Sequence, residues 1–201
     1  MPVITAIKPQ KNQKRVNIYL DNWFGFGLDL ENFVKFNLKV DQELNDEKIT
    51  KIIKEAEFQK ILDKLLKFAM LRPRSKKEII DYFKRKKVPE NIKEELLSRL
   101  NNLELINDKA FAKWWVEQRQ SFSPKSKRVL NSELLIKGID REIIKNILEE
   151  TKIDELKLAK DLIKTKNYKW EKFDQKTRRQ KITQYLAGKG FDWNVVNDVL
   201  K

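Results

Sequence analysis

Three stretches of this sequence share one pattern of apolar residues, repeated at an almost constant interval. The pattern centres on an apolar residue between two short helical segments, and this residue recurs at intervals of 51 and 52 positions as Val88, Ile139 and Phe191. Apolar residues recur at the same distances from it in all three stretches, namely Ile79, Leu130 and Ile182; Phe83, Leu134 and Leu186; and Ile92, Ile143 and Val195. A repeat of this length predicts tandem helical units, each of which buries its open face on the next.

The rest of the sequence indicates what precedes and surrounds these units. VITAI and RVNIYL are rich in β-branched residues and flank a polar turn, and WFGFGLDL could add a third strand. We therefore expect a strand-rich extension over residues 1–45 and three-helix repeats over 46–104, 105–152 and 153–201. The predicted fold is mainly α: an elongated, curved array of three tandem three-helix repeats with a small N-terminal β-hairpin extension.

Several residues mark where helices should begin and end. Asp46 and Asp108 are predicted to cap the first helices of the first two units. Ser75 with Glu78 three residues later forms a capping-box pattern, which predicts a helix start. Gly138 is expected to take a left-handed conformation at a helix end.

Residue types exclude most catalytic chemistry. The chain has no cysteine and no histidine, so the usual metal ligands and the Ser-His and Cys-His nucleophile systems are missing. It also contains no GxxxxGK[ST] phosphate-binding loop. We therefore expect no catalytic residue, no cofactor and no metal, and predict that the protein is not an enzyme.

The sequence also indicates the compartment in which the protein is found. The first ten residues, MPVITAIKPQ, lack the apolar core of a secretory signal, and no apolar run is long enough to span a membrane. The lack of cysteine is compatible with a reducing compartment. We expect a cytoplasmic monomer with no membrane partner.

The net charge of +14 favours a polyanionic partner such as nucleic acid. Residues 1–50 carry as many acidic as basic side chains, so the entire excess lies in the repeat region. The alternative is that a lysine-rich composition has no functional meaning here.

Basic residues gather where the middle helix of each unit should begin. Lys76, Lys127 and Arg179 occupy the same position in the repeat alignment. A helix start also offers free N–H groups and the positive end of the helix dipole, which suits phosphate or carboxylate oxygens. The candidate binding residues are Arg72, Arg74, Lys76, Lys77, Lys125, Lys127, Arg128, Lys176, Arg178, Arg179 and Lys181.

Structural interpretations of these residues remain open. The basic side chains could be solvated first-turn residues without a partner. Arg72 and Arg119 could instead form ion pairs with carboxylates such as Asp108. Trp114 and Trp115 are better explained as core residues than as platforms for stacked bases.

Three motifs, RPRSKKEIIDYFKRKKV, INDKAFAKWWVEQR and SELLIKGIDREII, resemble the RecX family of regulatory proteins. The resemblance covers about residues 56–200, and Ser126 departs from it because many members have glycine there. Besides Arg72 and Arg74, the matched residues are Ser75, Asp108, Phe111, Ala112, Arg119, Glu133, Leu134, Lys137, Gly138 and Ile139.

The resemblance implies a function. Proteins of this family are non-enzymatic modulators of the RecA recombinase that bind in the groove of the RecA–DNA filament. They block filament extension or promote disassembly, and so reduce ATP hydrolysis, strand exchange and the co-protease activity that drives the SOS response. The resemblance further implies weak binding to single- and double-stranded DNA without sequence preference.

Two other classes of function remain open from the residues alone. The short helix pairs could form a helix-turn-helix-like DNA-binding module without RecA contact. The array could also be a scaffold with no role at DNA.

Overall fold

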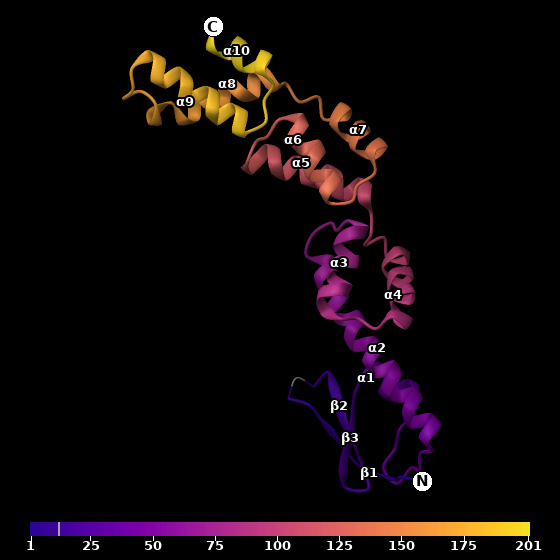
Figure 1. Cartoon of the computed structure of the whole chain (residues 1–201). Helices are drawn as coiled ribbons and strands as arrows, with labels where there is room; N and C mark the ends of the chain where they lie inside the picture. Colours follow the sequence, from indigo (N-terminus) through magenta and orange to yellow (C-terminus); the bar gives the residue numbers. More distant parts are fainter. Residues whose placement is uncertain (12) are drawn as a thin grey trace. The chain divides into compact units, whose positions relative to one another are not determined.

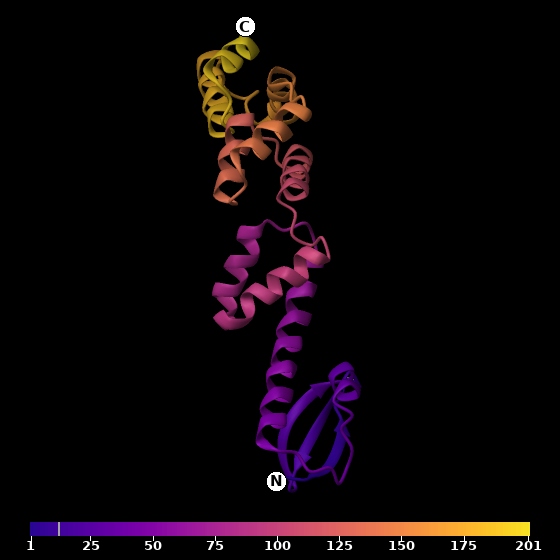
Figure 2. The same ribbon diagram turned by 90° about the vertical axis from the view of Figure 1, so that its right-hand side faces the viewer.

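The structure is a computed structural model that describes residues 1–11 and 13–201 (Figure 1, Figure 2). A small antiparallel sheet comes first and helices follow, which confirms the predicted mainly α class. Contacts divide the chain into two compact units: Met1–Met70 with Val88–Leu96, and Leu71–Lys87 with Leu97–Lys201.

The N-terminal extension is a three-stranded sheet in the order β1-β2-β3. Its strands are β1 (Ile4–Pro9), β2 (Arg15–Leu20) and β3 (Trp23–Asp29). Asp21 and Asn22 join β2 to β3 in a tight turn with φ values of +48° and +69°, a conformation that suits two-residue hairpins. The third strand is therefore the one that WFGFGLDL suggested.

The two edges of this sheet differ. Along β1, the backbone of Ile4 donates to Gln42 at 2.9 Å and Leu44 donates to Pro2 at 3.0 Å, so a returning segment covers that edge. Along β3, no further strand pairs with the outer edge among the described residues. The backbone of β3 is therefore open on one side, next to helix α2.

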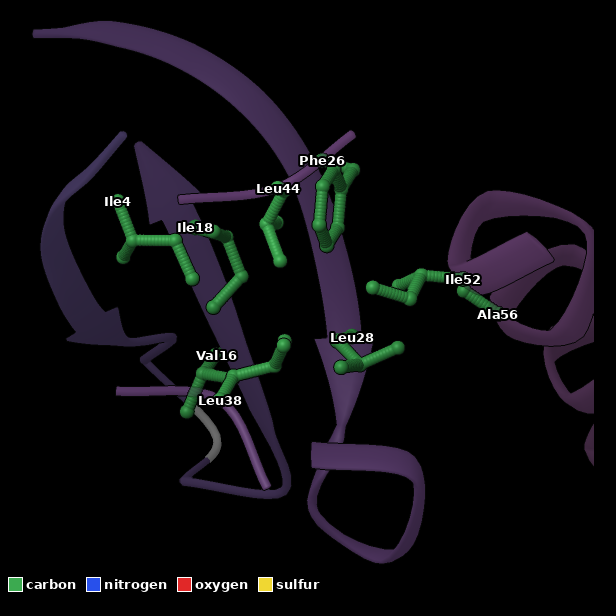
Figure 3. Close-up of a cluster of buried hydrophobic side chains, with 9 residues drawn as sticks. All are labelled: Ile4, Val16, Ile18, Phe26, Leu28, Leu38, Leu44, Ile52 and Ala56. Carbon is green, nitrogen blue, oxygen red and sulfur yellow. The ribbon is translucent and has the colours of Figure 1, made fainter. Parts of the chain in front are cut away.

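Two helices complete the first part of the chain, α1 (Leu30–Lys35) and α2 (Asp46–Met70). Figure 3 shows Phe26 and Leu28 of β3 directed toward Ile52 and Ala56 of α2. All four are buried, and this burial holds the sheet against the helix. The apolar side chains in the first half of α2 thus face the sheet.

Counted over the residues that the structure describes, nine helices run from α2 onward, and we refer to them in chain order as three groups of three. After α2 they are α3 (Lys76–Lys86), α4 (Glu90–Asn102), α5 (Asp108–Phe122), α6 (Lys127–Ile136), α7 (Arg141–Glu150), α8 (Glu155–Lys166), α9 (Gln175–Gly188) and α10 (Trp193–Leu200). A short 3-10 helix, η1 (Asn167–Lys169), follows α8.

The second and third groups each have a core built from the repeated apolar positions. Leu130, Leu134 and Ile139 belong to the core of the second group, together with Phe111 and Ala112. The corresponding core of the third group includes Ile182, Leu186 and Phe191. The repeat alignment therefore identified residues that are buried for the same reason in each group.

Three predicted helix starts were wrong by one or more residues. Asn45, not Asp46, accepts the N–H of Lys48 at 2.8 Å, and Asn107, not Asp108, accepts that of Ala110 at 2.9 Å. Helix α9 begins at Gln175 with Asp174 as its cap. Arg179 consequently lies in the second turn of its helix, whereas Lys76 and Lys127 are the first residues of theirs.

Candidate functional site

Ser75 and Gly138 form a junction between the first and second helical groups, within the second compact unit. Ser75 Oγ accepts the N–H of Glu78 at 3.2 Å, as the capping box predicted, and donates to the carbonyl of Lys137 at 2.9 Å. Gly138 has φ +78°, and a Cβ there would lie 2.8 Å from Cβ of Lys77. Both the left-handed backbone and the close approach therefore require glycine at this position.

A carboxylate from the second group completes the junction. Asp108 Oδ1 accepts the backbone N–H of Lys76, the first residue of α3, at 2.8 Å. A negative charge at this end of the helix is favourable, because it satisfies an unpaired donor and complements the helix dipole. The function of Asp108 is thus to join two groups of helices and not to cap its own helix.

The same junction recurs between the second and third groups. Glu155 Oε1 accepts the N–H of Lys127, the first residue of α6, at 2.7 Å, and the N–H of Ser126 donates to the carbonyl of Lys189 at 3.2 Å. Gly190 has φ +86°, and a Cβ there would lie 2.7 Å from Ser126 Oγ. The expectation that these helix starts offer free N–H groups was wrong for the first residue of each helix, because a carboxylate already accepts that N–H.

Glu78 is the centre of an ion-pair network at the first junction. Its carboxylate binds Arg72 through two hydrogen bonds of 2.8 and 3.0 Å and Lys137 through one of 3.0 Å. Burial opposes ionisation of this carboxyl, but the hydrogen bonds from Arg72 and Lys137 outweigh burial and hold its pKa below the ordinary value. Arg72 is therefore structural, with Glu78 and not Asp108 as its partner.

The neighbouring arginine has a similar structural role. Arg74 is almost fully buried, and its guanidinium lies 3.8 Å from the carboxylate of Glu78. Burial, and then the charge of Arg72, lower the pKa of Arg74. Neither arginine is available to bind a distant partner without dismantling the junction.

Arg119 belongs to a second network, inside the second group. Its Nε donates to Glu133 at 2.7 Å, and Trp115 Nε1 donates to the same carboxylate at 2.8 Å. The guanidinium carbon of Arg119 lies 4.7 Å from the centre of the Trp115 ring. Trp114 and Trp115 pack against the core of this group, as expected.

All ten motif-matched residues lie in the junction, the Arg119 network or this core: Ser75, Asp108, Phe111, Ala112, Arg119, Glu133, Leu134, Lys137, Gly138 and Ile139.

The remaining candidate cations are distributed over several surfaces. Lys77 Nζ donates to the carbonyl of Ile136 at 2.6 Å, and Arg178 donates to Asn167 at 2.7 Å, so both also have structural contacts. Lys181 Nζ lies 4.7 Å from the centre of the Phe173 ring. The exposed members of the set are Lys76, Lys77, Arg128, Lys176 and Arg179.

Lys127 and Arg128 line a shallow groove of about 370 Å³ between α6 and α7. The same groove is lined by Arg141 and Lys145, which the sequence analysis missed, and by a single carboxylate, Glu149. None of these four cations makes a salt bridge with a residue that the structure describes. The spacing of Arg141 and Lys145, four residues apart on one helix, was a signal that could have revealed this basic groove.

A second basic cluster lies around Tyr185 in the third group. Lys166 Nζ and Lys189 Nζ lie 4.8 and 5.8 Å from the centre of its ring. Burial, and then the charges of Lys125, Lys166 and Arg119, lower the pKa of Lys189. Among these residues, Lys125 is a predicted binding residue, and it is brought close to Lys189 because the N–H of the adjacent Ser126 donates to the Lys189 carbonyl.

Residues 1–11 and 13–201 contain neither a metal-binding cluster nor a membrane-spanning helix. No group of histidine, cysteine, aspartate and glutamate side chains there is arranged to hold a metal ion. None of the helices is long and apolar enough to cross a membrane.

Comparison with known proteins identifies the family. Residues 2–45 match the regulatory protein RecX N-terminal domain, residues 107–148 the second three-helix domain of RecX, and residues 153–200 the third. The regulatory protein RecX of Bacillus licheniformis is 35% identical over 207 residues, which cover 100% of this chain and 77% of that protein. The chain belongs to the RecX family of regulatory proteins.

Further relatives agree with this assignment. The RecX protein of Bacillus velezensis is 34% identical, over 100% of this chain and 77% of its own. A crystal structure of a regulatory protein RecX aligns with a TM-score of 0.69 and 26% identity, covering 99% of this chain and 98% of the other. The resemblance found in the sequence motifs is therefore confirmed, and the chain is a RecX-type regulatory protein with helical repeats.

Proposed function

We propose that this RecX-family protein is a non-enzymatic regulator that binds the RecA–DNA filament. Binding in the filament groove inhibits extension, ATP hydrolysis, strand exchange and co-protease activity, and so modulates recombination and the SOS response in the cytoplasm. The protein acts as a monomer and binds single- and double-stranded DNA only weakly and without sequence preference.

The observation that carries the proposal is the basic groove between α6 and α7. Four cations and only one carboxylate line this groove. Because no salt bridge with a described residue neutralises the four cations, the surface potential of the groove is positive. A RecA–DNA filament is a long polyanion that such a groove can contact through phosphate or through acidic protein surface. Family membership supports RecA as the protein component of that target.

The test is a titration of this protein into RecA on single-stranded DNA, with the rate of ATP hydrolysis as readout at two salt concentrations. Arg128→Glu, Arg141→Glu and Lys145→Glu are combined in one variant, which reverses three groove charges. Inhibition by this variant should need at least about ten-fold more protein, because salt-sensitive contacts to the polyanion are lost.

A second triple variant serves as a control with the same change in net charge. Lys157, Lys160 and Lys164 are exposed on α8, outside the groove, and their conversion to glutamate should change the inhibitory potency less than about three-fold. Equal losses in the two variants, or none in either, would show that the groove is not the contact. A chain that binds DNA but leaves RecA activity unchanged would favour the helix-turn-helix-like module.

A further inference from the structure

A second groove, of about 700 Å³, lies in the first compact unit between α2 and the open edge of β3. Lys60, Lys64 and Lys67 line it from α2, and Lys14 and Arg15 line it from the other side. The volume is typical of a ligand site, and all lining residues belong to the N-terminal seventy. None of its lining residues is among the predicted binding residues or lines the groove between α6 and α7.

The three lysines of α2 are placed to act together. They are spaced four and three residues apart, so they project from one face of the helix over a rise of about 10 Å. All three are exposed, and none makes a salt bridge with a described residue. Their charges are therefore available to an external anion.

Three carboxylates also line the groove, but two of them already have donors. Asp29 accepts the N–H and the side-chain amide of Asn32 at 2.9 and 3.0 Å, at the start of α1. Asp63 accepts the side-chain amide of Gln59 at 2.9 Å. Glu57 is the third, so the five cations that line the groove leave a net positive charge.

The groove also presents an exposed aromatic ring. Phe24 of β3 is 60% exposed and meets Tyr19 edge-on, with ring centres 6.1 Å apart and planes at 82°. This contact holds the ring on a strand, so its free face is presented at little further cost in side-chain entropy. Gly25 and Gly27 follow it along β3 and also line the groove, and a Cβ there would lie 3.0 Å from Leu20 and 3.1 Å from Gln10, respectively.

We infer that this groove binds single-stranded nucleic acid, with phosphates along Lys60, Lys64 and Lys67 and a base stacked on Phe24. Cationic grooves with aromatic rings are the common means of holding single strands without sequence preference, because every base has a face that can stack. A duplex keeps its bases stacked on one another, so it cannot offer a base to Phe24. The inference does not depend on RecA and adds a contact to the regulator proposed above.

The test measures fluorescence anisotropy of a labelled oligothymidylate, which forms no base pairs, during titration with the full chain. Lys60→Glu with Lys64→Glu should weaken binding at least about ten-fold and should lower the slope of log K against log salt by about 1.4, because two phosphate contacts are lost. The matched control is Lys51→Glu with Lys54→Glu, two exposed lysines of the same helix that do not line the groove. The control should change affinity less than about three-fold.

Phe24→Leu tests the stacked base separately. It keeps an apolar side chain at an exposed position and should weaken oligothymidylate binding about five-fold or more. The same substitution should leave the weak binding of a duplex unchanged. Replacing one thymine by 5-iodouracil should give a light-induced cross-link to a peptide that contains Phe24.

The outcomes separate this inference from its alternatives. Equal losses in the two lysine variants would mean that only net charge matters, and they would overturn the inference. Equal effects of Phe24→Leu on single strand and duplex, or cross-links confined to other peptides, would overturn it as well. The oligothymidylate experiment contains no RecA, so a negative result in it does not contradict the proposed regulation of RecA. A negative result in the RecA titration likewise does not contradict binding in this groove.

Discussion

The hydroxyl of Ser75 donates a hydrogen bond of 2.9 Å to the backbone carbonyl of Lys137, 62 residues further along the chain. The same hydroxyl accepts the N–H of Glu78 and so begins α3. One small side chain therefore starts a helix and holds the next helical group against it. Any change at Ser75 should affect both local and long-range structure.

Ser75→Ala should lower the free energy of unfolding by about 1–2 kcal/mol, because a helix cap and a buried hydrogen bond are lost together. Urea unfolding followed by circular dichroism measures this change. Ser98→Ala, at an exposed position inside α4, should change stability by less than about 0.5 kcal/mol. If both variants unfold at the same urea concentration, the long-range bond contributes nothing.

The glycines offer a pair of substitutions with opposite expected signs. Gly138→Ala should destabilise by about 1–2 kcal/mol or more, because φ is +78° and the new Cβ would meet Cβ of Lys77. Gly188→Ala should stabilise by about 0.5–1 kcal/mol, because nothing lies within 4 Å of its Cβ and the residue is helical. Thermal or urea unfolding checks both, and a stabilising Gly138→Ala would contradict the junction geometry.

The pKa of Glu78 makes the first junction sensitive to acid. Because its pKa is lower in the folded chain than in the unfolded chain, its stabilising effect is complete above the unfolded value of about 4.3. This effect is lost as the pH falls through the folded value. Glu78→Gln should therefore be less stable than the unmodified chain at pH 7, and the difference should shrink below about pH 4.3.

Urea unfolding at a series of pH values measures this dependence. The control is Glu117→Gln, at an exposed position on α5, which should leave the pH profile unchanged. A constant difference between Glu78→Gln and the unmodified chain from pH 7 to pH 3 would show that ionisation of Glu78 does not strengthen the junction.

The two carboxylates that reach back to the preceding group should act independently. Asp108→Ala and Glu155→Ala each remove a charged acceptor from a helix start, at an expected cost of about 1–2 kcal/mol. Because they share no partner, their effects should add within about 0.5 kcal/mol in the double variant. Ser75→Ala and Asp108→Ala should not add, since both side chains serve the start of α3.

The sequence was sufficient for the parts of the fold that follow from periodicity. Val88, Ile139 and Phe191 are all buried, because an apolar residue between two short helices has no other favourable place. The glycines before Ile139 and Phe191 were likewise recognisable, since a helix that ends there needs a positive φ. The mainly α class followed from these features.

Contacts between groups could not be predicted from the repeat. Asp108 and Glu155 each accept the N–H of the first residue of a helix in the preceding group. Their side chains differ in length, and their spacing differs from the repeat interval. The longer connection before α9 shifted Arg179 into the second turn, which the apolar alignment could not reveal because it registers only core positions. Arg72 pairs with Glu78 because the fold brings these two side chains together. From the sequence alone, Asp108 was an equally good partner for Arg72.

The residues of the candidate site could be predicted only in part from the sequence. Basic residues are frequent in this chain, and sequence alone does not separate those that pair internally from those that do not. Arg74 and Arg128 look equivalent in the sequence, yet one is buried beside Glu78 and the other is exposed in a groove. Only the fold makes this distinction.

Repulsion between Lys189 and the cations around it should lower the free energy of unfolding of the free protein. Its pKa is lowered by burial and then by Lys125, Lys166 and Arg119, so keeping the ammonium charged costs free energy. Lys189→Met should therefore raise the free energy of unfolding by up to about 1 kcal/mol, a value discounted for screening by solvent. Urea unfolding at low salt measures this gain, and added salt should stabilise the unmodified chain more than the variant.

The direction of the pH effect provides an independent check on the same residue. A lysine whose pKa is lower in the folded chain binds fewer protons there than in the unfolded chain, so stability should rise as the pH increases through the folded value. The variant should lack this rise, whereas Lys160→Met, at an exposed position on α8, should retain it. If Lys189→Met is less stable than the unmodified chain at low salt, packing of the lysine stem outweighs the repulsion and the cluster is not strained.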